Sequence, residues 1–202
     1  MIRAEFAARL KNACAAVTAA EAELTEIDSK FGDADHGLTM AKIAGAISEA
    51  VDAAEGGIQS MLDDAAMAVM TLNGGSAVPL WNTWLDGMQE EAPEGDEIDV
   101  AGIKAIFARA FTELDDMSGA KVGDKTMMDA LIPASQAIAA YPGSDENELF
   151  TAAAQAAVQG AEATRQFVSK FGRAKSYGTK TIGTPDAGAV SMSWFFQGLA
   201  RE

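Results

Sequence analysis

Three aspartates lie close together in the sequence and could hold a divalent cation. Asp28, Asp33 and Asp35 fall within eight residues, in a glycine-containing stretch between two segments with helical periodicity. Carboxylate oxygens on a tight turn are the ligands that Mg²⁺ prefers. Counted from Asp28 or from Asp33, the twelfth residue is Thr39 or Ala44 instead of Glu, so the stretch is not an EF-hand loop. The predicted cation site is therefore open, with room for water or phosphate oxygens.

An equally weighted alternative makes the same stretch purely structural. Asp28 would then cap or end the first helix, and Asp33 and Asp35 would be solvated turn residues. His36 follows directly and is the one histidine of the chain. A lone histidine is more often a packed or capping residue than a catalyst. We therefore expect His36 to position the loop or a phosphate group and not to act as a general base.

Two further stretches could bind an anion. Residues 73–77 (Asn-Gly-Gly-Ser-Ala) precede a predicted helix, whose N-terminal N–H groups and dipole favour a phosphate. A C-cap glycine followed by an N-cap serine explains the same residues, and we give that alternative more weight. Residues 172–188 carry Arg173, Lys175 and Lys180 on an acidic chain, which fits a loop facing a phosphate and, equally, a solvated basic loop.

Residues 122–129 resemble part of a P-loop because they contain Gly-Asp-Lys-Thr. The required G-x-x-x-x-G-K-[ST] spacing is absent, however, and G-x-G-x-x-G does not occur elsewhere in the chain. The sequence therefore excludes the P-loop and Rossmann types of nucleotide site.

Composition limits the partners and the compartment. A chain of 202 residues with 49% hydrophobic residues can bury a sizeable core, and we expect one domain over residues 1–202. The net charge of −15 argues against nucleic acid as a partner and calls for bound cations if the ligand is phosphorylated. Cys14 is a single cysteine, and no apolar run could form a signal peptide or cross a membrane. We expect a soluble cytoplasmic protein with no membrane partner.

The elements that position these stretches are all predicted to be helices. Alanine-rich segments with apolar residues three and four apart recur along the chain, and no alternating strand pattern stands out. The predicted helices cover residues 2–27, 38–54, 58–72, 77–91, 99–116, 125–140, 146–170 and 187–200. If neighbouring helices run up and down, the loops after the first, third, fifth and seventh helices meet at one end. Those loops are residues 28–37, 73–77, 118–124 and 172–188.

The order of the motifs is more specific than any one of them. It runs Leu24-Thr25-x-x-Asp28, Gly32-Asp33-Ala34-Asp35-His36-Gly37, Gly74-Gly75-x-x-x-Pro79-Leu80, Gly123-Asp124-Lys125-Thr126-Met127-x-Asp129-Ala130, Gly172-Arg173-Ala174 and the stretch 183–188. In this order the chain closely resembles the nucleotide-binding L subunit of dihydroxyacetone kinases, the DhaL family. The resemblance covers essentially the whole chain. It implies an all-α fold, an antiparallel barrel of eight helices with ADP or ATP bound in the loops at one end.

The resemblance also implies the site residues. Two Mg²⁺ ions would bridge Asp28, Asp33 and Asp35 to the phosphates of the nucleotide. Nucleotide contacts would come from His36, Gly37, Leu38, Thr39, Ser76, Ala77, Gly119, Met127, Arg173, Asp186, Ala187 and Gly188. Arg173 would also act as the catalytic residue by stabilising charge on the transferring phosphoryl group, and Met127 would give the adenine an apolar face.

By the same resemblance the chain would be a phosphotransferase subunit. It would deliver a phosphoryl group from Mg²⁺-bound ATP to dihydroxyacetone, or a related short ketose, held covalently on a separate K subunit. In one mode ADP stays bound and is rephosphorylated by a phosphoenolpyruvate-dependent phosphotransferase system through an M-type phosphocarrier; in the other, ATP exchanges freely. The alternative from a different class is a non-catalytic module that binds nucleotide or lipid. A homodimer is also left open.

The chain departs from the family pattern at three places. Gly74-Gly75 is followed by Ser76-Ala77-Val78 where the family commonly has Ala-Ser-Gly. Thr39 stands for a common Asn, and Ala187 stands for the proline of a common Asp-Pro-Gly. These differences predict altered phosphate contacts and point toward a relative that serves another short ketose, such as a tetrulose.

Overall fold

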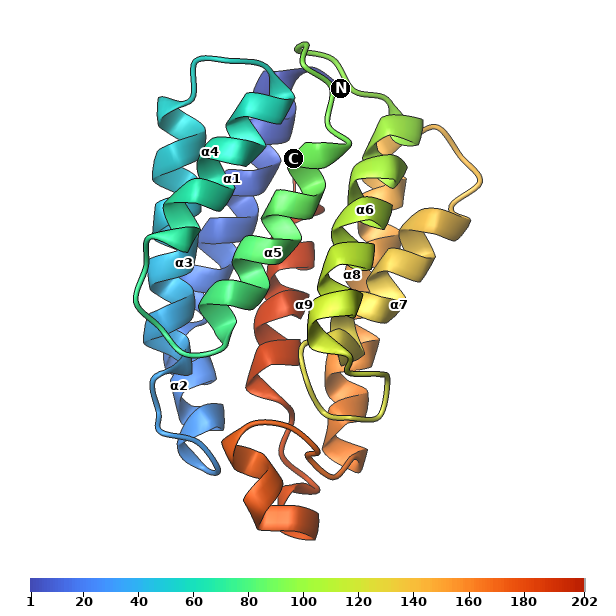
Figure 1. Cartoon of the computed structure of the whole chain (residues 1–202). Coiled ribbons are helices and arrows are strands. Elements are labelled where there is room, and N and C mark those ends of the chain that lie inside the picture. Colours follow the sequence, from blue (N-terminus) through green and yellow to red (C-terminus); the bar gives the residue numbers. More distant parts are fainter. Residues whose placement is uncertain (202) are drawn as a thin grey trace.

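The computed structural model describes residues 1–201, and over those residues the chain is almost entirely helical (Figure 1). The α-helices are α1 (Arg3–Ala19), α2 (Glu21–Ser29), α3 (His36–Ala53), α4 (Ile58–Met70), α5 (Ala77–Glu90), α6 (Val100–Ser118), α7 (Met128–Ala140), α8 (Glu146–Ala163) and α9 (Ala187–Leu199). Two 3₁₀ segments follow α8, namely η1 (Thr164–Gln166) and η2 (Arg173–Thr181). The prediction of an all-α chain is confirmed.

The long helices close into a barrel. In the order α1, α3, α4, α5, α6, α7, α8 and α9, each helix packs against the next, and α9 returns to pack against α1. Successive helices run in opposite directions, so that the N-terminus and the end of α9 lie toward one end and η2 lies at the other (Figure 1). The short α2 continues α1 toward the η2 end and packs on α3. The predicted eight-helix antiparallel arrangement is therefore present, with α1 and α2 sharing one position.

Aromatic side chains fill the centre of the barrel. Trp81 and Trp84 of α5, Phe107 of α6, and Phe195 and Phe196 of α9 are each at most 2% exposed. Their ring centroids lie 5.1 to 6.4 Å apart, mostly edge to face. Burial of each such ring stabilises the fold by about 2–3 kcal/mol, and the edge-to-face contacts add to this. The interior is thus a packed core that fixes the spacing of the helices around it.

Two predicted helix boundaries are wrong. The segment 2–27 is interrupted at Ala20, whose N–H bonds to Val17 O at 3.1 Å in a tightened turn, and no glycine or proline signals the break. The segment 146–170 stops at Ala163, because Thr164 folds its hydroxyl back onto Ala161 O and the chain passes through η1 into an irregular stretch. The helical turn η2 inside the loop 172–188 was not predicted.

The four chemically distinctive loops meet at the same end of the barrel, as the up-and-down argument predicts. They follow α2, α4, α6 and α8, and residues from all four line one cavity. Among residues 1–201, no helix is long and apolar enough to cross a membrane.

Candidate functional site

A cavity of about 540 Å³ opens where the four loops meet. One side is formed by the end of α2, the following loop and the first turn of α3. The start of α5 and the loop after α6 form a second side, and the segment from residue 169 to the start of α9 forms the third. The barrel therefore acts as a rigid support, and the chemistry-bearing groups lie on loops that it holds together.

The three aspartates converge at the edge of this cavity. Asp28, Asp33 and Asp35 each offer a carboxylate oxygen within 4.8 Å of the others. Ala34 has a φ of 61°, a left-handed conformation that costs a non-glycine residue about 1 kcal/mol, and it lies between the two loop aspartates. A Cβ at Gly32 would overlap the Asp28 carboxylate, so only glycine lets the loop pass this close. The loop is built to bring the carboxylates together.

Asp28 has a structural role that differs from the expected cap of the first helix. Its Oδ2 accepts the N–H groups of Asp35 at 3.2 Å and His36 at 3.4 Å, so it caps the start of α3. Burial raises the pKa of Asp35, and the negative charges of Asp33 and Asp28 raise it further. This mutual repulsion is what a divalent cation would relieve, so the donor set fits Mg²⁺.

The basic segment closes over the aspartate loop. Arg173 Nη2 lies 2.7 Å from Asp33 Oδ2, and the Tyr177 ring packs on Phe31 with centroids 5.2 Å apart. Gly172 and Gly178 adopt left-handed φ angles of 60° and 56°, which turn the chain at either side of this contact. The Arg173 side chain is 71% exposed and lines the cavity, so it can also reach a ligand there.

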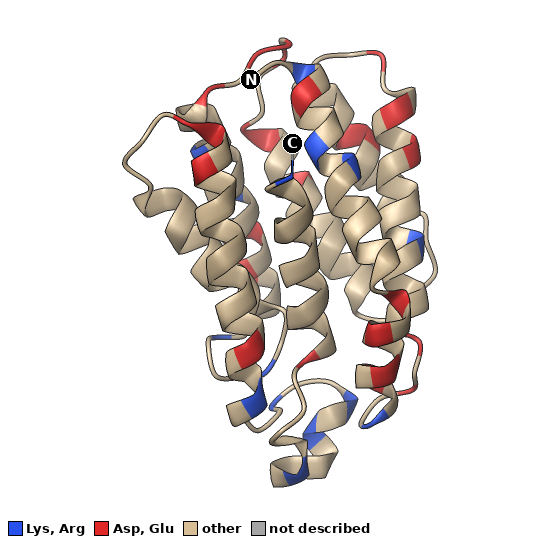
Figure 2. Ribbon diagram, turned by 180° about the vertical axis from the view of Figure 1, so that it is seen from behind, with Lys and Arg blue, Asp and Glu red and all other residues tan. Residues whose placement is uncertain are grey.

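Charge is distributed unevenly over the molecule. Figure 2 shows both basic and acidic residues at the η2 end, where Arg173, Lys175 and Lys180 lie on η2, beside the loop that carries Asp33 and Asp35. An anion approaching this end therefore meets both signs of charge, and a bound cation would be needed to offset the three aspartates.

His36 links the aspartate loop to α9. Its Nε2 lies 3.2 Å from the Ser191 hydroxyl, and its ring also bonds to the backbone of Ala187. Burial lowers the pKa of His36, although the charges of Asp28 and Asp35 oppose that shift. A histidine with its nitrogens engaged by protein groups fits the expected positioning role.

Most of the expected nucleotide-contact residues line the cavity. They are His36, Thr39, Ser76, Ala77, Met127, Arg173, Asp186, Ala187 and Gly188. Gly37, Leu38 and Gly119 do not. A Cβ at Gly37 would overlap Glu21 O, so this residue serves the packing of α3 on α2. The Leu38 side chain is 50% exposed outside the cavity, and Gly119 is the left-handed C-cap of α6, with a φ of 63°.

Sequence reasoning missed several residues of the cavity wall. Phe31, Met117 and Phe171 supply apolar surface that only the fold brings together. Pro79 and Leu80 also line the wall, and their place in the matched motif Gly-Gly-x-x-x-Pro-Leu was the available signal.

Lys125 belongs to the stretch that partly resembles a P-loop. It is 4% exposed and adopts a φ of 61°, and burial lowers its pKa. Its neighbour Asp129 is buried as well and accepts the N–H groups of Gly123 at 2.6 Å and Thr126 at 2.7 Å. These bonds fix the loop that leads into α7 and holds Met127 at the cavity.

Asp186 caps α9 and has the largest carboxyl shift in the site. Its Oδ2 accepts the N–H of Ala189 at 2.8 Å. Asp186 is partly buried at the cavity wall, and burial raises the pKa of its carboxyl to about 7, with the Asp129 charge raising it and the Lys125 charge opposing the rise. Asp186 is therefore a helix cap whose charge changes near neutral pH.

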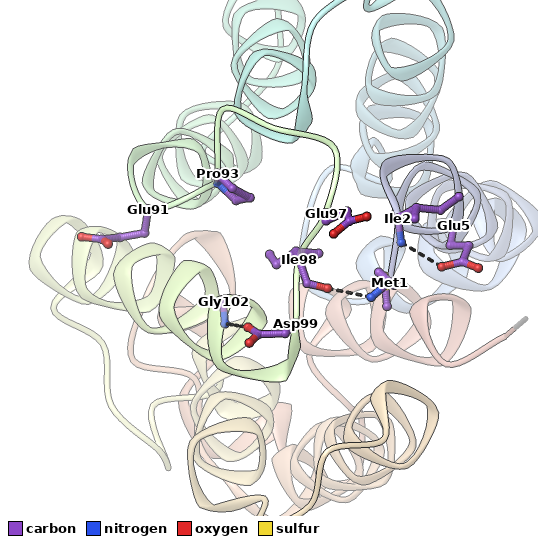
Figure 3. A pocket seen from close by; sticks show the side chains of 9 residues that line it. All are labelled: Met1, Ile2, Glu5, Glu91, Pro93, Glu97, Ile98, Asp99 and Gly102. Carbon is purple, nitrogen blue, oxygen red and sulfur yellow. Dashed lines mark hydrogen bonds between the residues drawn. The ribbon is translucent and has the colours of Figure 1, made fainter.

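A second cavity, of about 640 Å³, lies at the opposite end of the barrel (Figure 3). Its polar groups are used for local structure: the terminal amine of Met1 donates to Ile98 O at 2.7 Å, and Asp99 caps α6 through Gly102 N at 2.8 Å. The lining also includes Glu5, Glu91 and Glu97, whose negative charges would repel phosphate. This cavity does not fit a nucleotide.

A comparison of the sequence with models of known protein families identifies the family of this chain. The profile of the DAK2 domain matches residues 30–201, which includes all of the cavity wall except the end of α2. The chain belongs to the DAK2 domain family. The resemblance to DhaL proteins found in the sequence is thereby confirmed.

Curated relatives of this DAK2 domain include kinases of short ketoses. It is 36% identical over 196 residues to a D-erythrulose kinase of Mycolicibacterium smegmatis, and 34% identical over 204 residues to an L-erythrulose kinase of Pectobacterium atrosepticum. These alignments cover 94% and 96% of the chain, which spans 34% of the length of each relative. The ADP-binding subunit DhaL of a phosphoenolpyruvate-dependent dihydroxyacetone kinase from Escherichia coli is 28% identical, and 91% of its length is covered.

The fold of the DAK2 domain is also found in a solved structure. The dihydroxyacetone kinase from C. freundii, crystallised in complex with AMP-PNP and Mg²⁺, matches 98% of the chain with a TM-score of 0.73 and 25% identity. The match covers 33% of that protein.

Proposed function

We propose that this DAK2 domain binds Mg²⁺ together with ADP or ATP in the cavity at the η2 end of the barrel. The observation that carries the proposal is the convergence of the Asp28, Asp33 and Asp35 carboxylates within 4.8 Å, beside the exposed Arg173 guanidinium. The names of the relatives support it, since the Escherichia coli protein is an ADP-binding subunit and the C. freundii enzyme was crystallised with AMP-PNP and Mg²⁺.

Each group in the cavity has a separate part in this proposal. The three aspartates would hold two Mg²⁺ ions, which neutralise phosphate charge when bound. N–H groups at the start of α5, at Ser76 and Ala77, would donate to phosphate oxygens, whereas those of Ala189 and Val190 in α9 are bonded to Asp186. Arg173 would leave Asp33 and stabilise charge on the transferring phosphoryl group. Met127 would pack on the base.

We further propose phosphoryl transfer to a short ketose held covalently on a K subunit or K domain. The chain spans about a third of the length of the erythrulose kinases it resembles, so the ketose-binding part would lie outside residues 1–202. Erythrulose is a four-carbon ketose, and these relatives therefore favour a tetrulose over dihydroxyacetone, in line with the three departures at Thr39, Ser76–Val78 and Ala187.

The lipid-binding alternative has little support. A lipid would need space inside the barrel, and Trp84, Phe107 and Phe196 pack there, each 0% exposed. The cavity that is open carries carboxylates and a guanidinium, which suit a hydrated, charged ligand.

Retention of nucleotide separates the two kinase modes. Protein purified in Mg²⁺ and passed through gel filtration is analysed for bound ADP by mass spectrometry, and then supplied with a K subunit and erythrulose or dihydroxyacetone. ADP that stays bound and is rephosphorylated in place by an M-type phosphocarrier indicates the phosphoenolpyruvate-dependent mode. Rapid loss of ADP with turnover on added ATP indicates the exchanging mode, and no phosphoryl transfer with either donor contradicts the kinase proposal.

A further inference from the structure

A buried junction behind the cavity wall joins three segments that are distant in sequence. Lys125 Nζ donates to Thr164 O at 2.6 Å and to Thr184 O at 2.5 Å. The Thr164 hydroxyl accepts the N–H of Asp186 at 2.8 Å and donates to Ala161 O at 2.5 Å. Thr164 is 0% exposed and does not line the cavity, whereas Lys125, 4% exposed, also borders it.

The end of α8 explains why a lysine is stable at this place. The last carbonyls of a helix lack partners within it and carry the negative end of the helix dipole. They therefore accept the ammonium of Lys125, and the charges of Asp186 and Asp129 favour it further. Burying an ammonium is costly unless its donors are satisfied. The charge of Lys125 is thus used inside the protein, unlike that of a P-loop lysine.

The junction connects two backbone segments that form walls of the cavity, one leading into α7 and one leading into α9. Lys125 leads directly into Met127 on one wall, and Asp186 leads into Gly188, in the first turn of α9, on the other. The walls are close together, since a Cβ placed on Gly188 would lie 3.3 Å from Met127 N. A small displacement of either segment would change the width of the cavity between Met127 and Gly188.

We propose that Thr164 is a positioning residue that, together with the bonds of Lys125, holds these two walls in place, so that nucleotide affinity depends on a hydroxyl that a ligand in the cavity does not touch. The inference rests on the proposed nucleotide-binding function. A cavity binds a ligand tightly only when its walls are already in place, and here the Thr164 hydroxyl fixes the backbone of Asp186, in the segment that lines the cavity from Pro185 to Gly188.

A pair of variants at Thr164 separates positioning from packing. Thr164→Val keeps the volume and removes the hydroxyl, whereas Thr164→Ser keeps the hydroxyl and removes a buried methyl group. We expect Thr164→Val to weaken binding of Mg²⁺–ADP at least tenfold by calorimetry and to speed hydrogen exchange of the amides of residues 186–190. We expect Thr164→Ser to melt at a lower temperature but to bind Mg²⁺–ADP within about threefold of the wild type.

Ser193→Ala is the matched control. The Ser193 hydroxyl is buried and donates to Val190 O at 2.8 Å, a bond of the same local kind within α9 that joins no other segment. Its loss should leave both ADP affinity and exchange at 186–190 unchanged. Wild-type affinity in Thr164→Val, or equal weakening in Thr164→Ser, would overturn the inference. If the wild type does not bind ADP, the proposed function fails, and unchanged exchange in Thr164→Val would then separately overturn the junction.

Discussion

Asp186 makes the stability of the fold depend on pH in a way that one substitution removes. Asp186→Asn keeps an oxygen that can accept the N–H of Ala189 but cannot ionise. Burial raises the pKa of Asp186 from 3.8 to about 7, so between these values the folded state holds a proton that the unfolded state has lost. The stabilisation from this proton is complete below pH 3.8 and is lost as pH rises through 7.

The size of the effect follows from the two pKa values. The difference between the unfolded-state pKa of 3.8 and the folded-state pKa of about 7 corresponds to about 4 kcal/mol of unfolding free energy. About 2.5 kcal/mol of this is lost between pH 5 and pH 8. Urea denaturation of both proteins without nucleotide measures it. The free energy of unfolding of the wild type, relative to Asp186→Asn, should fall by about that amount from pH 5 to pH 8.

The matched control is Asp99→Asn, which changes an exposed N-cap carboxylate at the start of α6 that bonds Gly102 N at 2.8 Å. It tests whether loss of any cap carboxylate produces the same pH dependence. Parallel pH curves for the wild type and Asp186→Asn would refute the reasoning, because they would mean that the carboxyl is ionised in the folded protein over the whole range.

Three further predictions concern the core, the α2 packing and the basic loop. Trp84→Ala should lower the free energy of unfolding by about 3–5 kcal/mol in urea denaturation, because it opens a cavity in the aromatic centre; a loss below about 1 kcal/mol would contradict the packed core. Gly37→Ala should weaken the binding of Mg²⁺ measured by calorimetry, because the added methyl group would push α3 away from α2, which carries Asp28. Unchanged Mg²⁺ affinity would contradict this dependence of the cation site on the packing of α3 against α2. Arg173→Ala should cost less than about 1 kcal/mol of stability without Mg²⁺, because its ion pair with Asp33 is exposed, and a larger loss on thermal melting would contradict this.

Periodicity and loop order could be predicted from the sequence because they depend on local pattern. The apolar spacing indicated the helices, and the alternation of their directions indicated that the aspartate loop and the Arg173 loop meet at one end. The aspartate cluster could be predicted for the same reason, since its three carboxylates lie within eight residues.

The features that the sequence did not reveal depend on contacts between distant segments. The end of α8 at Ala163 is one such feature, because the carbonyl of the following residue, Thr164, accepts the ammonium of Lys125 from a distant part of the chain. The role of Gly37 also follows from packing, as its missing side chain admits the Glu21 carbonyl of a neighbouring helix. Such contacts override the local helix propensity and cannot be recognised from a short stretch of sequence.

Calorimetric titration of ADP, with and without Mg²⁺, into wild type and Asp33→Asn tests the central claim most directly. Asp33 is chosen because its carboxylate belongs to the predicted cation site, and Asp63→Asn, an exposed change on α4, is the control. The account predicts that ADP binds tightly only with Mg²⁺, and that a chelator releases ADP without unfolding the helices. It also predicts at least tenfold weaker ADP binding in Asp33→Asn and unchanged ADP binding in Asp63→Asn. Equal ADP affinity in the wild type with and without Mg²⁺, or wild-type affinity in Asp33→Asn, would contradict it.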